Sequence, residues 1–250
     1  MNKFKLTLLV AGVLSALAAC STTTNNNEPT RTTTLAATTN TASQQLNTLV
    51  EQYFVESLQF SPLSATYIGY SQYNNQFTAP STEQNRATQQ AFYQDYQQRL
   101  AAIDKQQLTG QALLSYEILE RDLALTIAGF QFPSYLLPIN QMSGAHNTFA
   151  GFGSAQSAQP FVTFQDYENF ISRAQGFVTW LASVQDAMRQ GIEQGIVLPK
   201  PLAEKLLPQF QAHIVTSAEQ SLFYSPIKQL PADFSAEQKQ QLTKQYSALI

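Results

Sequence analysis

The sequence contains a single cysteine, two histidines and a small share of charged residues. One cysteine excludes an intramolecular disulfide, and two histidines alone cannot supply the three protein ligands of a catalytic zinc site. Lysine and arginine number 14 against 17 aspartates and glutamates, which gives a net charge of −3. Because phosphate backbones are bound by clustered basic side chains and no such cluster occurs here, nucleic acid is excluded as a partner.

The composition is nevertheless that of a folded protein. Hydrophobic residues make up 44% of the 250 residues, which is enough for a packed core. Charged residues make up only 12%, and the 32 glutamines outnumber all 31 charged side chains. We therefore expect amide side chains to cover much of the surface.

The first twenty residues have the features of a bacterial export signal. Lys3 and Lys5 precede an apolar run over residues 6–19, shorter than the about 20 apolar residues that a membrane-spanning helix needs. The run ends in Leu-Ala-Ala-Cys at residues 17–20, which resembles the lipobox of bacterial lipoproteins. This resemblance implies cleavage before Cys20 and a lipid anchor on Cys20. The alternative is an ordinary signal peptide in which Cys20 is incidental.

The residue after Cys20 bears on where the anchored protein would go. Position 21 is Ser rather than Asp, so the inner-membrane retention signal of enteric-type bacteria is absent. The lipoprotein resemblance therefore implies an outer-membrane protein that faces the periplasm. Its membrane partner would be a tether rather than a substrate, because acyl chains anchor through their own buried methylenes.

The rest of the chain is predicted to be a flexible tether followed by one all-α domain. Residues 20–43 are rich in Thr and Asn and have Leu35 as their one large apolar residue, which favours a tether. Over residues 44–250, apolar side chains recur at steps of three and four, and no strand alternation occurs. The predicted helices cover about residues 46–60, 82–104, 109–127, 164–195, 201–222 and 235–249, with capping boxes at Ser81, Thr163 and Ser235, Thr109 as a further cap, and a kink at Pro208.

The predicted helix over residues 109–127 is apolar on two faces, and we expect it to be central to the domain. The two stripes are Leu114, Ile118 and Leu125 on one face, and Tyr116, Leu119, Leu123 and Ile127 on the other. Glu117 and Arg121 lie one turn apart on this helix. We predict that they form an ion pair rather than take part in catalysis.

Residues 129–162 are predicted to form one long irregular loop, because prolines and glycines interrupt the helical period. Asn140, Gln141 and His146 lie in this loop beside apolar residues, and their side chains can hydrogen-bond a peptide backbone. Two interpretations stay open. The three residues form a wall of a substrate cleft, or Asn140 and Gln141 hydrogen-bond the loop's own backbone and hold it rigid.

Motifs of the common hydrolases are absent from the sequence. A zincin carries His-Glu-x-x-His on a helix, whereas His146 is followed by Asn and His213 by Ile. Residues 151–155 do not match the nucleophile elbow Gly-x-Ser-x-Gly. We therefore assign no catalytic residue, no metal ligand and no cofactor to this chain, and we expect His213 to be an ordinary surface or core histidine.

Several segments, in order, resemble the bacterial domain of unknown function 885. They are residues 61–69, residues 135–144 (Tyr-Leu-Leu-Pro-Ile-Asn-Gln-Met-Ser-Gly), residues 160–173 and residues 191–199. The resemblance covers about residues 45–250. It implies a mostly helical protein similar to zinc metallopeptidases of the gluzincin kind, and its many lipoprotein members agree with the motif at Cys20.

The zinc motif of this family lies in the second half of longer members, and no position from 1 to 250 matches it. The resemblance therefore implies zinc only for a full-length homologue and transfers no catalytic residue. The last predicted helix is still in phase at Leu249, so we expect the domain to be incomplete at its C-terminus. The alternative is a natural C-terminal helix.

Two functions follow from the sequence. In the first, the chain is the N-terminal portion of a larger metallopeptidase-like lipoprotein, inactive alone, whose partners are a peptide substrate and the missing C-terminal half. In the second, it is a complete, non-enzymatic helical lipoprotein that binds peptides or a periplasmic partner.

Overall fold

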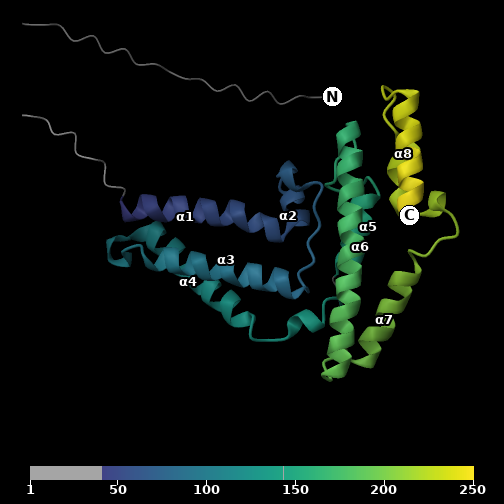
Figure 1. Ribbon diagram of the computed structural model, residues 1–250. Coiled ribbons are helices and arrows are strands. Elements are labelled where there is room, and N and C mark those ends of the chain that lie inside the picture. Colours follow the sequence, from purple (N-terminus) through teal and green to yellow (C-terminus); the bar gives the residue numbers. More distant parts are fainter. Residues whose placement is uncertain (1–40, 143) are drawn as a thin grey trace, which may run out of the picture. The chain divides into compact units, whose positions relative to one another are not determined.

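The computed structural model describes residues 41–142 and 144–250, which belong to one compact unit. Throughout these residues the structure is α-helical with short 3-10 segments and without strands, which confirms the predicted all-α array (Figure 1). The helices are α1 (Ala42–Ser57), α2 (Pro62–Tyr67), α3 (Glu83–Ala101), α4 (Gly110–Gly129), α5 (Ala145–Gly153), α6 (Phe164–Glu193), α7 (Lys200–Gln211) and α8 (Ala236–Leu249). The predicted export signal, Cys20 and most of the predicted tether lie outside the described residues.

Helices α1, α3 and α4 pack against one another around a shared apolar core. The core includes Leu46 and Leu49 of α1, Tyr96 and Leu100 of α3, and Leu119 and Leu123 of α4. Helix α1 begins two residues before the expected start of the domain because Thr41 and Gln44 form a capping box. The Thr41 N–H donates to Gln44 Oε1 at 2.9 Å, and the Gln44 N–H donates to Thr41 Oγ1 at 3.3 Å.

The start of α3 differs from the prediction by one residue. The cap is Thr82, whose Oγ1 accepts a hydrogen bond from the Asn85 N–H at 3.4 Å, and the predicted box at Ser81 does not form. Ser81 is instead buried beside the start of the helix. Thr109 precedes α4 as predicted, but its side chain makes no capping hydrogen bond.

Helix α4 is not the central helix that the sequence predicted. Its first stripe is exposed to between 49% and 60% at Leu114, Ile118 and Leu125, while its second stripe supplies the buried residues. The physical reason is that α1 and α3 cover only one side of α4.

The predicted ion pair between Glu117 and Arg121 is also wrong. Lys105, in the turn before α4, pairs with Glu117 at 3.5 Å and with Glu120 at 3.1 Å. Arg121 forms no ion pair with a described residue.

The predicted loop over residues 129–162 contains a helix. Residues 134–136 form a 3-10 turn, and α5 follows with Phe149 and Phe152 buried against α6. Gly153, whose presence suggested a loop, is required by packing: a Cβ atom there would lie 2.3 Å from Cδ1 of Phe223. Tertiary burial of aromatic side chains therefore outweighs the weak helix propensity of this stretch.

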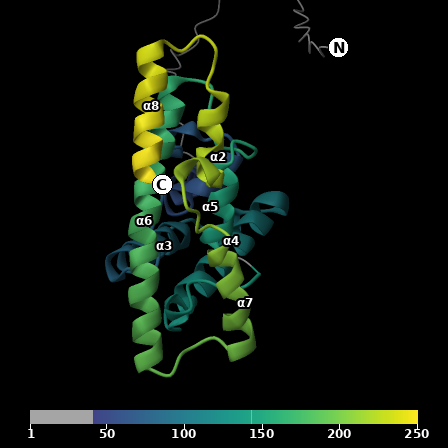
Figure 2. The ribbon, with the colours of Figure 1, turned by 90° about the vertical axis from the view of Figure 1, so that its right-hand side faces the viewer.

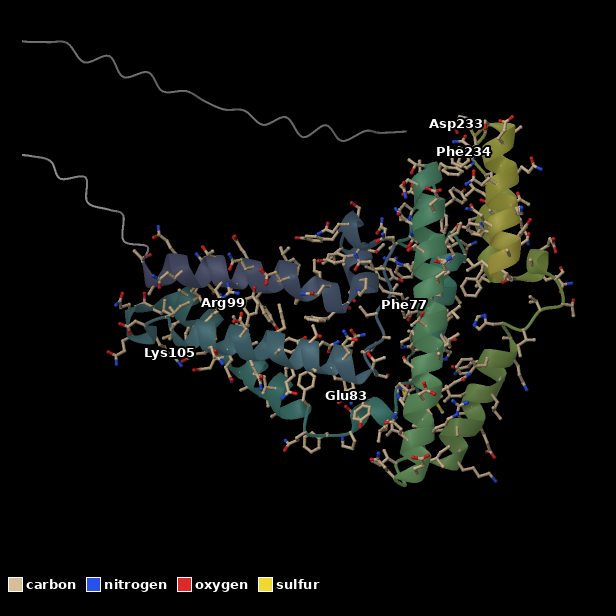
Figure 3. The ribbon with its side chains drawn as sticks, viewed as in Figure 1. Phe77, Glu83, Arg99, Lys105, Asp233 and Phe234 are labelled. Atoms are coloured by element: carbon tan, nitrogen blue, oxygen red, sulfur yellow. The ribbon has the colours of Figure 1, made fainter. Side chains whose placement is uncertain are left out.

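Helix α6 is the longest helix of the described chain, and its predicted capping box is confirmed. The Asp166 N–H donates to Thr163 Oγ1 at 3.2 Å, and the Thr163 N–H donates to Asp166 Oδ2 at 2.8 Å. Phe77 lies against this helix (Figure 3), with its ring centroid 5.4 Å from that of Phe177. Not all apolar residues of α6 are covered, since Val178 and Met188 are 58% and 37% exposed.

Helices α7 and α8 accompany different parts of α6 (Figure 2). Leu242 and Tyr246 of α8 are buried in one core with the first half of α6, and Leu206 of α7 is buried with its second half. Helix α7 ends at Gln211, so the predicted continuation to about residue 222 is wrong. Two 3-10 segments, 218–220 and 222–229, follow it because their aromatic and apolar residues pack into the core beside α5 and α8.

Arg173 of α6 is completely buried and joins α6 to the segment after α2. Its Nε donates to the Gln76 carbonyl oxygen at 3.0 Å, and its Nη1 donates to Gln159 Oε1 at 2.5 Å. Its Nη2 donates to Thr66 Oγ1 at 2.8 Å and to the Tyr73 carbonyl oxygen. Burial lowers the pKa of Arg173 to about 10, because these partners are dipoles and none is a carboxylate.

Candidate functional site

The structure brings two of the three predicted cleft residues together and turns the third toward its own loop. Gln141 and His146 meet around Gln209 of α7, a residue that the sequence did not indicate. Asn140 Oδ1 accepts a hydrogen bond from the Met142 N–H at 2.9 Å, as the second sequence interpretation anticipated. Asn140 therefore shapes the segment that leads into α5.

The carboxamide of Gln209 is the centre of a hydrogen-bond network. Its Nε2 donates to the Gln141 carbonyl oxygen at 2.9 Å, and its Oε1 accepts from Asn147 Nδ2 at 3.0 Å. The same Oε1 lies 3.0 Å from His146 Nε2. Because a carboxamide oxygen only accepts, this arrangement assigns the proton of neutral His146 to Nε2. The network fastens α7 to the start of α5 and to the segment before it.

Two acceptors beside this network are buried and have no hydrogen-bond partner among the described residues. They are His146 Nδ1 and Gln141 Oε1. His146 is only 2% exposed, and its ring stacks on Phe210 with centroids 4.6 Å apart. Phe210 also lines an apolar groove, so the polar network directly adjoins it.

The groove lies between the second half of α6, α7 and the segment 136–139. Its volume is about 430 Å³, within the range of small-ligand pockets. The groove is lined by Leu136, Leu137, Pro138, Ile139, Leu181, Val184, Gln185, Met188, Ile192, Ile196, Val197, Leu198, Ala203, Leu206, Leu207 and Phe210. None of these lining residues carries a charge, so the groove is suited to apolar groups rather than to ions.

The described residues do not fit a zinc ion. No group of three or more His, Cys, Asp or Glu that could hold a metal occurs in residues 41–142 and 144–250. His213 lies in the turn after α7 and packs near Phe223, with ring centroids 6.3 Å apart. The zinc that the sequence resemblance implies for a full-length homologue therefore has no set of ligands among these described residues.

Comparison with known families assigns the chain. A family model described as bacterial protein of unknown function (DUF885) matches residues 62–250. The chain belongs to the DUF885 family. No curated protein and no solved structure matches the sequence.

The DUF885 match contains every residue of the groove and of the Gln209 network, whereas α1 precedes it. The resemblance found in the sequence is thus confirmed at the level of the family. Within the described part of this DUF885 chain, no helix is both long and apolar enough to cross a membrane.

No sequence motif of this DUF885 chain points to the α7 side of the site. Gln209 follows Pro208 and belongs to no motif, so nothing in the sequence marks it. The groove did have a signal: Leu206 and Leu207 are adjacent, and successive helix positions lie about 100° apart, so the two side chains face different neighbours. The structure buries Leu206 and leaves Leu207 61% exposed at the groove.

Proposed function

We propose that this DUF885 chain binds apolar segments of peptides in the groove between segment 136–139, α6 and α7. The observation that carries the proposal is the uncharged, apolar lining of a hollow of about 430 Å³. Ile192 and Leu207 are 68% and 61% exposed there. Clustered exposed apolar residues mark interaction sites, and covering one such side chain contributes roughly 1.5–3 kcal/mol.

The polar residues predicted from the sequence support the groove rather than line it. Gln209 joins α7 to Gln141, two residues after the wall formed by residues 136–139, and to His146 at the start of α5. These hydrogen bonds hold two walls of the groove at a fixed separation. A preformed groove binds more tightly because less ordering remains to be done when the peptide arrives.

The proposal extends to the cellular setting and to the chemistry. The lipobox-like segment at residues 17–20 supports anchoring through Cys20 to the outer membrane, with the helical domain in the periplasm. The likeness of the family to gluzincin metallopeptidases supports a role for the groove as a wall of a substrate cleft. Because no zinc-binding motif occurs among the 250 residues, this chain binds peptide without hydrolysing it.

The non-enzymatic alternative uses the same groove. In that case the bound peptide, or an apolar segment of a periplasmic partner, is held and released unchanged. The observation that favours it is that the described α6, α7 and segment 136–139 already form a hollow of about 430 Å³ with an uncharged lining.

Peptide binding can be measured by the fluorescence of Trp180, the single tryptophan, which is buried with Ile139, Val184 and Leu206 behind the groove. The probe is an acetylated and amidated hexapeptide, Ser-Leu-Phe-Leu-Gly-Ser, which carries no charge. We expect saturable binding that Leu207→Lys weakens at least tenfold, since a charge would stand in the apolar groove.

The matched control is Leu114→Lys, an equally simple change at an exposed leucine of α4 outside the groove. It should leave the affinity within twofold. No binding by the native chain, or equal losses in the two variants, would refute binding in the groove. The proposal also states that the chain does not hydrolyse the peptide. Chromatography of the peptide after incubation with the protein and added Zn²⁺ tests this, and cleaved peptide would contradict it.

A further inference from the structure

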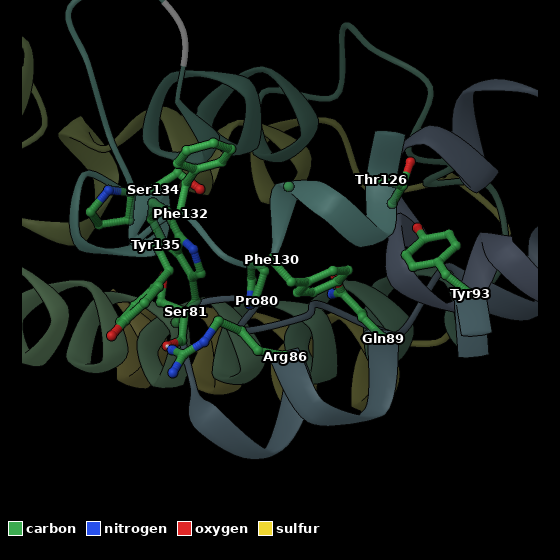
Figure 4. Close-up of a pocket in the computed structure, with 13 residues that line it drawn as sticks. Pro80, Ser81, Arg86, Gln89, Tyr93, Thr126, Phe130, Phe132, Ser134 and Tyr135 are labelled. Atoms are coloured by element: carbon green, nitrogen blue, oxygen red, sulfur yellow. The ribbon is translucent and has the colours of Figure 1, made fainter. Parts of the chain in front are cut away.

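A second pocket lies between α3, the end of α4 and residues 132–138. Its volume is about 380 Å³, and it is lined by Pro80, Ser81, Arg86, Gln89, Tyr93, Thr126, Gly129, Phe130, Phe132, Ser134, Tyr135, Pro138 and Trp180. Figure 4 shows Arg86 beside Ser81 and Tyr135 at one end of the pocket, while Tyr93 and Thr126 stand at the other. Pro138 also lines the apolar groove, so segment 132–139 separates the two hollows.

The guanidinium of Arg86 is held in position by two contacts and keeps N–H donors that can bind a ligand. Its Nη1 donates to the Ser81 carbonyl oxygen at 2.6 Å, and its guanidinium carbon lies 3.4 Å from the centroid of the Tyr135 ring. No described carboxylate forms an ion pair with it. A guanidinium has five N–H donors in a planar fork, and stacking on a ring leaves the edge of that fork free to bind an oxyanion.

The charges near Arg86 leave a positive site inside the pocket. Arg86 is the one charged side chain among the described residues that line it. Glu83 and Asp186 border a neighbouring hollow that Arg86 also touches. Asp186 is paired with Arg189 at 3.0 Å, and neither acid lines the pocket of Figure 4.

The remaining walls determine what kind of anion fits. Phe130, Phe132 and Pro138 offer apolar surface, while Gln89 and Ser134 offer hydrogen-bond donors and acceptors. A small inorganic anion would hydrogen-bond Arg86 but leave the apolar walls of the pocket exposed to water. A carboxylate next to an apolar side chain would use both features, and the volume accommodates about one or two amino acid residues.

We propose that this pocket binds the C-terminal residue of a peptide, with its carboxylate on the Arg86 fork and its apolar side chain against the aromatic wall. The proposal takes its ligand class from the peptide binding proposed above, but its site is separate. It adds a specificity that the uncharged groove cannot provide, namely a preference for a free C-terminus.

The test compares acetyl-Leu-Phe with its C-terminal amide by isothermal titration calorimetry. We expect the native chain to bind the acid at least tenfold more tightly than the amide, because only the carboxylate forms charge-assisted, bidentate hydrogen bonds with Arg86. Arg86→Gln should abolish this preference and leave the affinity for the amide within twofold. Arg86→Lys should retain part of it, since the charge remains while the fork is lost.

The control variant is Arg121→Gln, which removes an exposed arginine of α4 that lies outside the pocket. It should keep the full preference for the acid. Circular dichroism verifies that each variant is folded. Equal affinity for acid and amide in the native chain, a preference that survives Arg86→Gln, or phosphate binding as tight as that of the acid would each overturn the proposal.

The two binding proposals can be refuted independently of each other. The blocked hexapeptide has no carboxylate and reports only on the apolar groove. Leu207→Lys removes groove binding and should leave the acid preference of acetyl-Leu-Phe unchanged. If the hexapeptide does not bind while the acid preference persists, the groove assignment falls and the Arg86 pocket stands.

Discussion

Arg173 shows how a single side chain can organise a fold without a countercharge. Its guanidinium is fully buried and donates four hydrogen bonds to neutral oxygens of the segments around Thr66, Tyr73, Gln76 and Gln159. Removing the guanidinium would take a donor from each of these oxygens, although the Tyr73 carbonyl oxygen also accepts from the Gln76 N–H at 3.0 Å. The desolvation cost of the cation is therefore offset by dipoles, and the geometry of the planar fork is essential.

We predict that Arg173→Lys lowers the free energy of unfolding by about 2–4 kcal/mol, because an ammonium cannot span the same set of acceptors. Chemical denaturation of both proteins measures this difference. The control is Arg189→Lys, whose pairing with Asp186 is exposed to solvent and should change stability by less than about 0.5 kcal/mol. Equal stability of Arg173→Lys and the native chain would show that the hydrogen bonds of Arg173 are dispensable.

A prediction at Cys20 tests the lipid anchor. Expressed from the full sequence in a bacterium, the native protein should incorporate labelled palmitate and sediment with outer membranes, whereas Cys20→Ser should do neither. Ser21→Asp is the informative control, since it should retain the label but move the protein to the inner membrane. Labelled Cys20→Ser protein would contradict lipidation at this residue.

At the level of the element, helix boundaries follow local hydrogen bonding where a capping box is complete. The boxes at Thr41, Thr163 and Ser235 set the starts of α1, α6 and α8. Where a cap is incomplete, as at Thr109, the helix begins there through packing instead. Helix α5 is the extreme case, since Phe149 and Phe152 stabilise it despite its glycines.

We predict that Thr163→Ala costs about 1 kcal/mol of stability, because the Asp166 N–H at the start of α6 loses its side-chain acceptor and keeps only the Thr163 carbonyl oxygen, at 3.0 Å. The matched control is Thr179→Ala on an exposed face of the same helix, where alanine has the higher helix propensity. That change should be neutral or slightly stabilising. A thermal melt with equal losses for the two variants would refute the cap's contribution.

At the scale of the whole molecule, buried tyrosines connect the cores to the pH dependence of stability. Burial, with a smaller contribution from the hydrogen bond to Glu56, raises the pKa of Tyr96 to about 12. Burial also raises the pKa of Tyr246, a residue of α8 that is completely buried in the core shared with α6. Between pH 10 and 12, the unfolded chain loses these protons while the folded chain keeps them, so stability falls as the pH rises. The lowered pKa of Arg173 acts in the opposite direction, through one group.

The expected outcome is a melting temperature that declines steadily above about pH 10 and is nearly constant from pH 7 to 9. Tyr246→Phe removes one contributing hydroxyl, so its melting temperature should fall less steeply over the alkaline range. Measuring both proteins at pH 7 separates this slope from any loss of packing. Parallel curves for the two proteins above pH 10 would contradict a role for Tyr246.

The sequence predicts the class of fold and most of the helices, but not which face of each helix its neighbours bury. Apolar periodicity located α1, α3, α4, α6, α7 and α8 because burial on one face leaves a period of about 3.6 residues. It missed α2, which is only six residues long, and it missed α5. It also extended α7 beyond Gln211, because the glycines and aromatic residues of α5 and of the segment after α7 follow tertiary packing. The exposure of Leu114, Ile118 and Leu125 has the same origin, since periodicity cannot tell whether a neighbour covers a given stripe.

The sequence also pointed to the region of the candidate site without identifying its members. It placed Asn140, Gln141 and His146 in a segment of interest, whereas the groove depends on α7 and on the partner residue Gln209. Arg86 belongs to no sequence motif. It lines a pocket only because α3 packs beside residues 132–138. The contacts of Arg86 with Tyr135 and of Gln209 with Gln141 join residues that are far apart in the chain and have no local pattern, so sequence alone could not supply them.

By itself, the sequence determined the helical class and the family. These depend on local hydrogen bonding, on composition and on short runs of residues. The tertiary structure decided which apolar stripes are covered, which polar side chain joins α5 to α7, and where an arginine remains free to bind an anion. Those properties depend on which distant segments meet, because burial, desolvation and the satisfaction of hydrogen bonds are set by neighbours in space rather than along the chain.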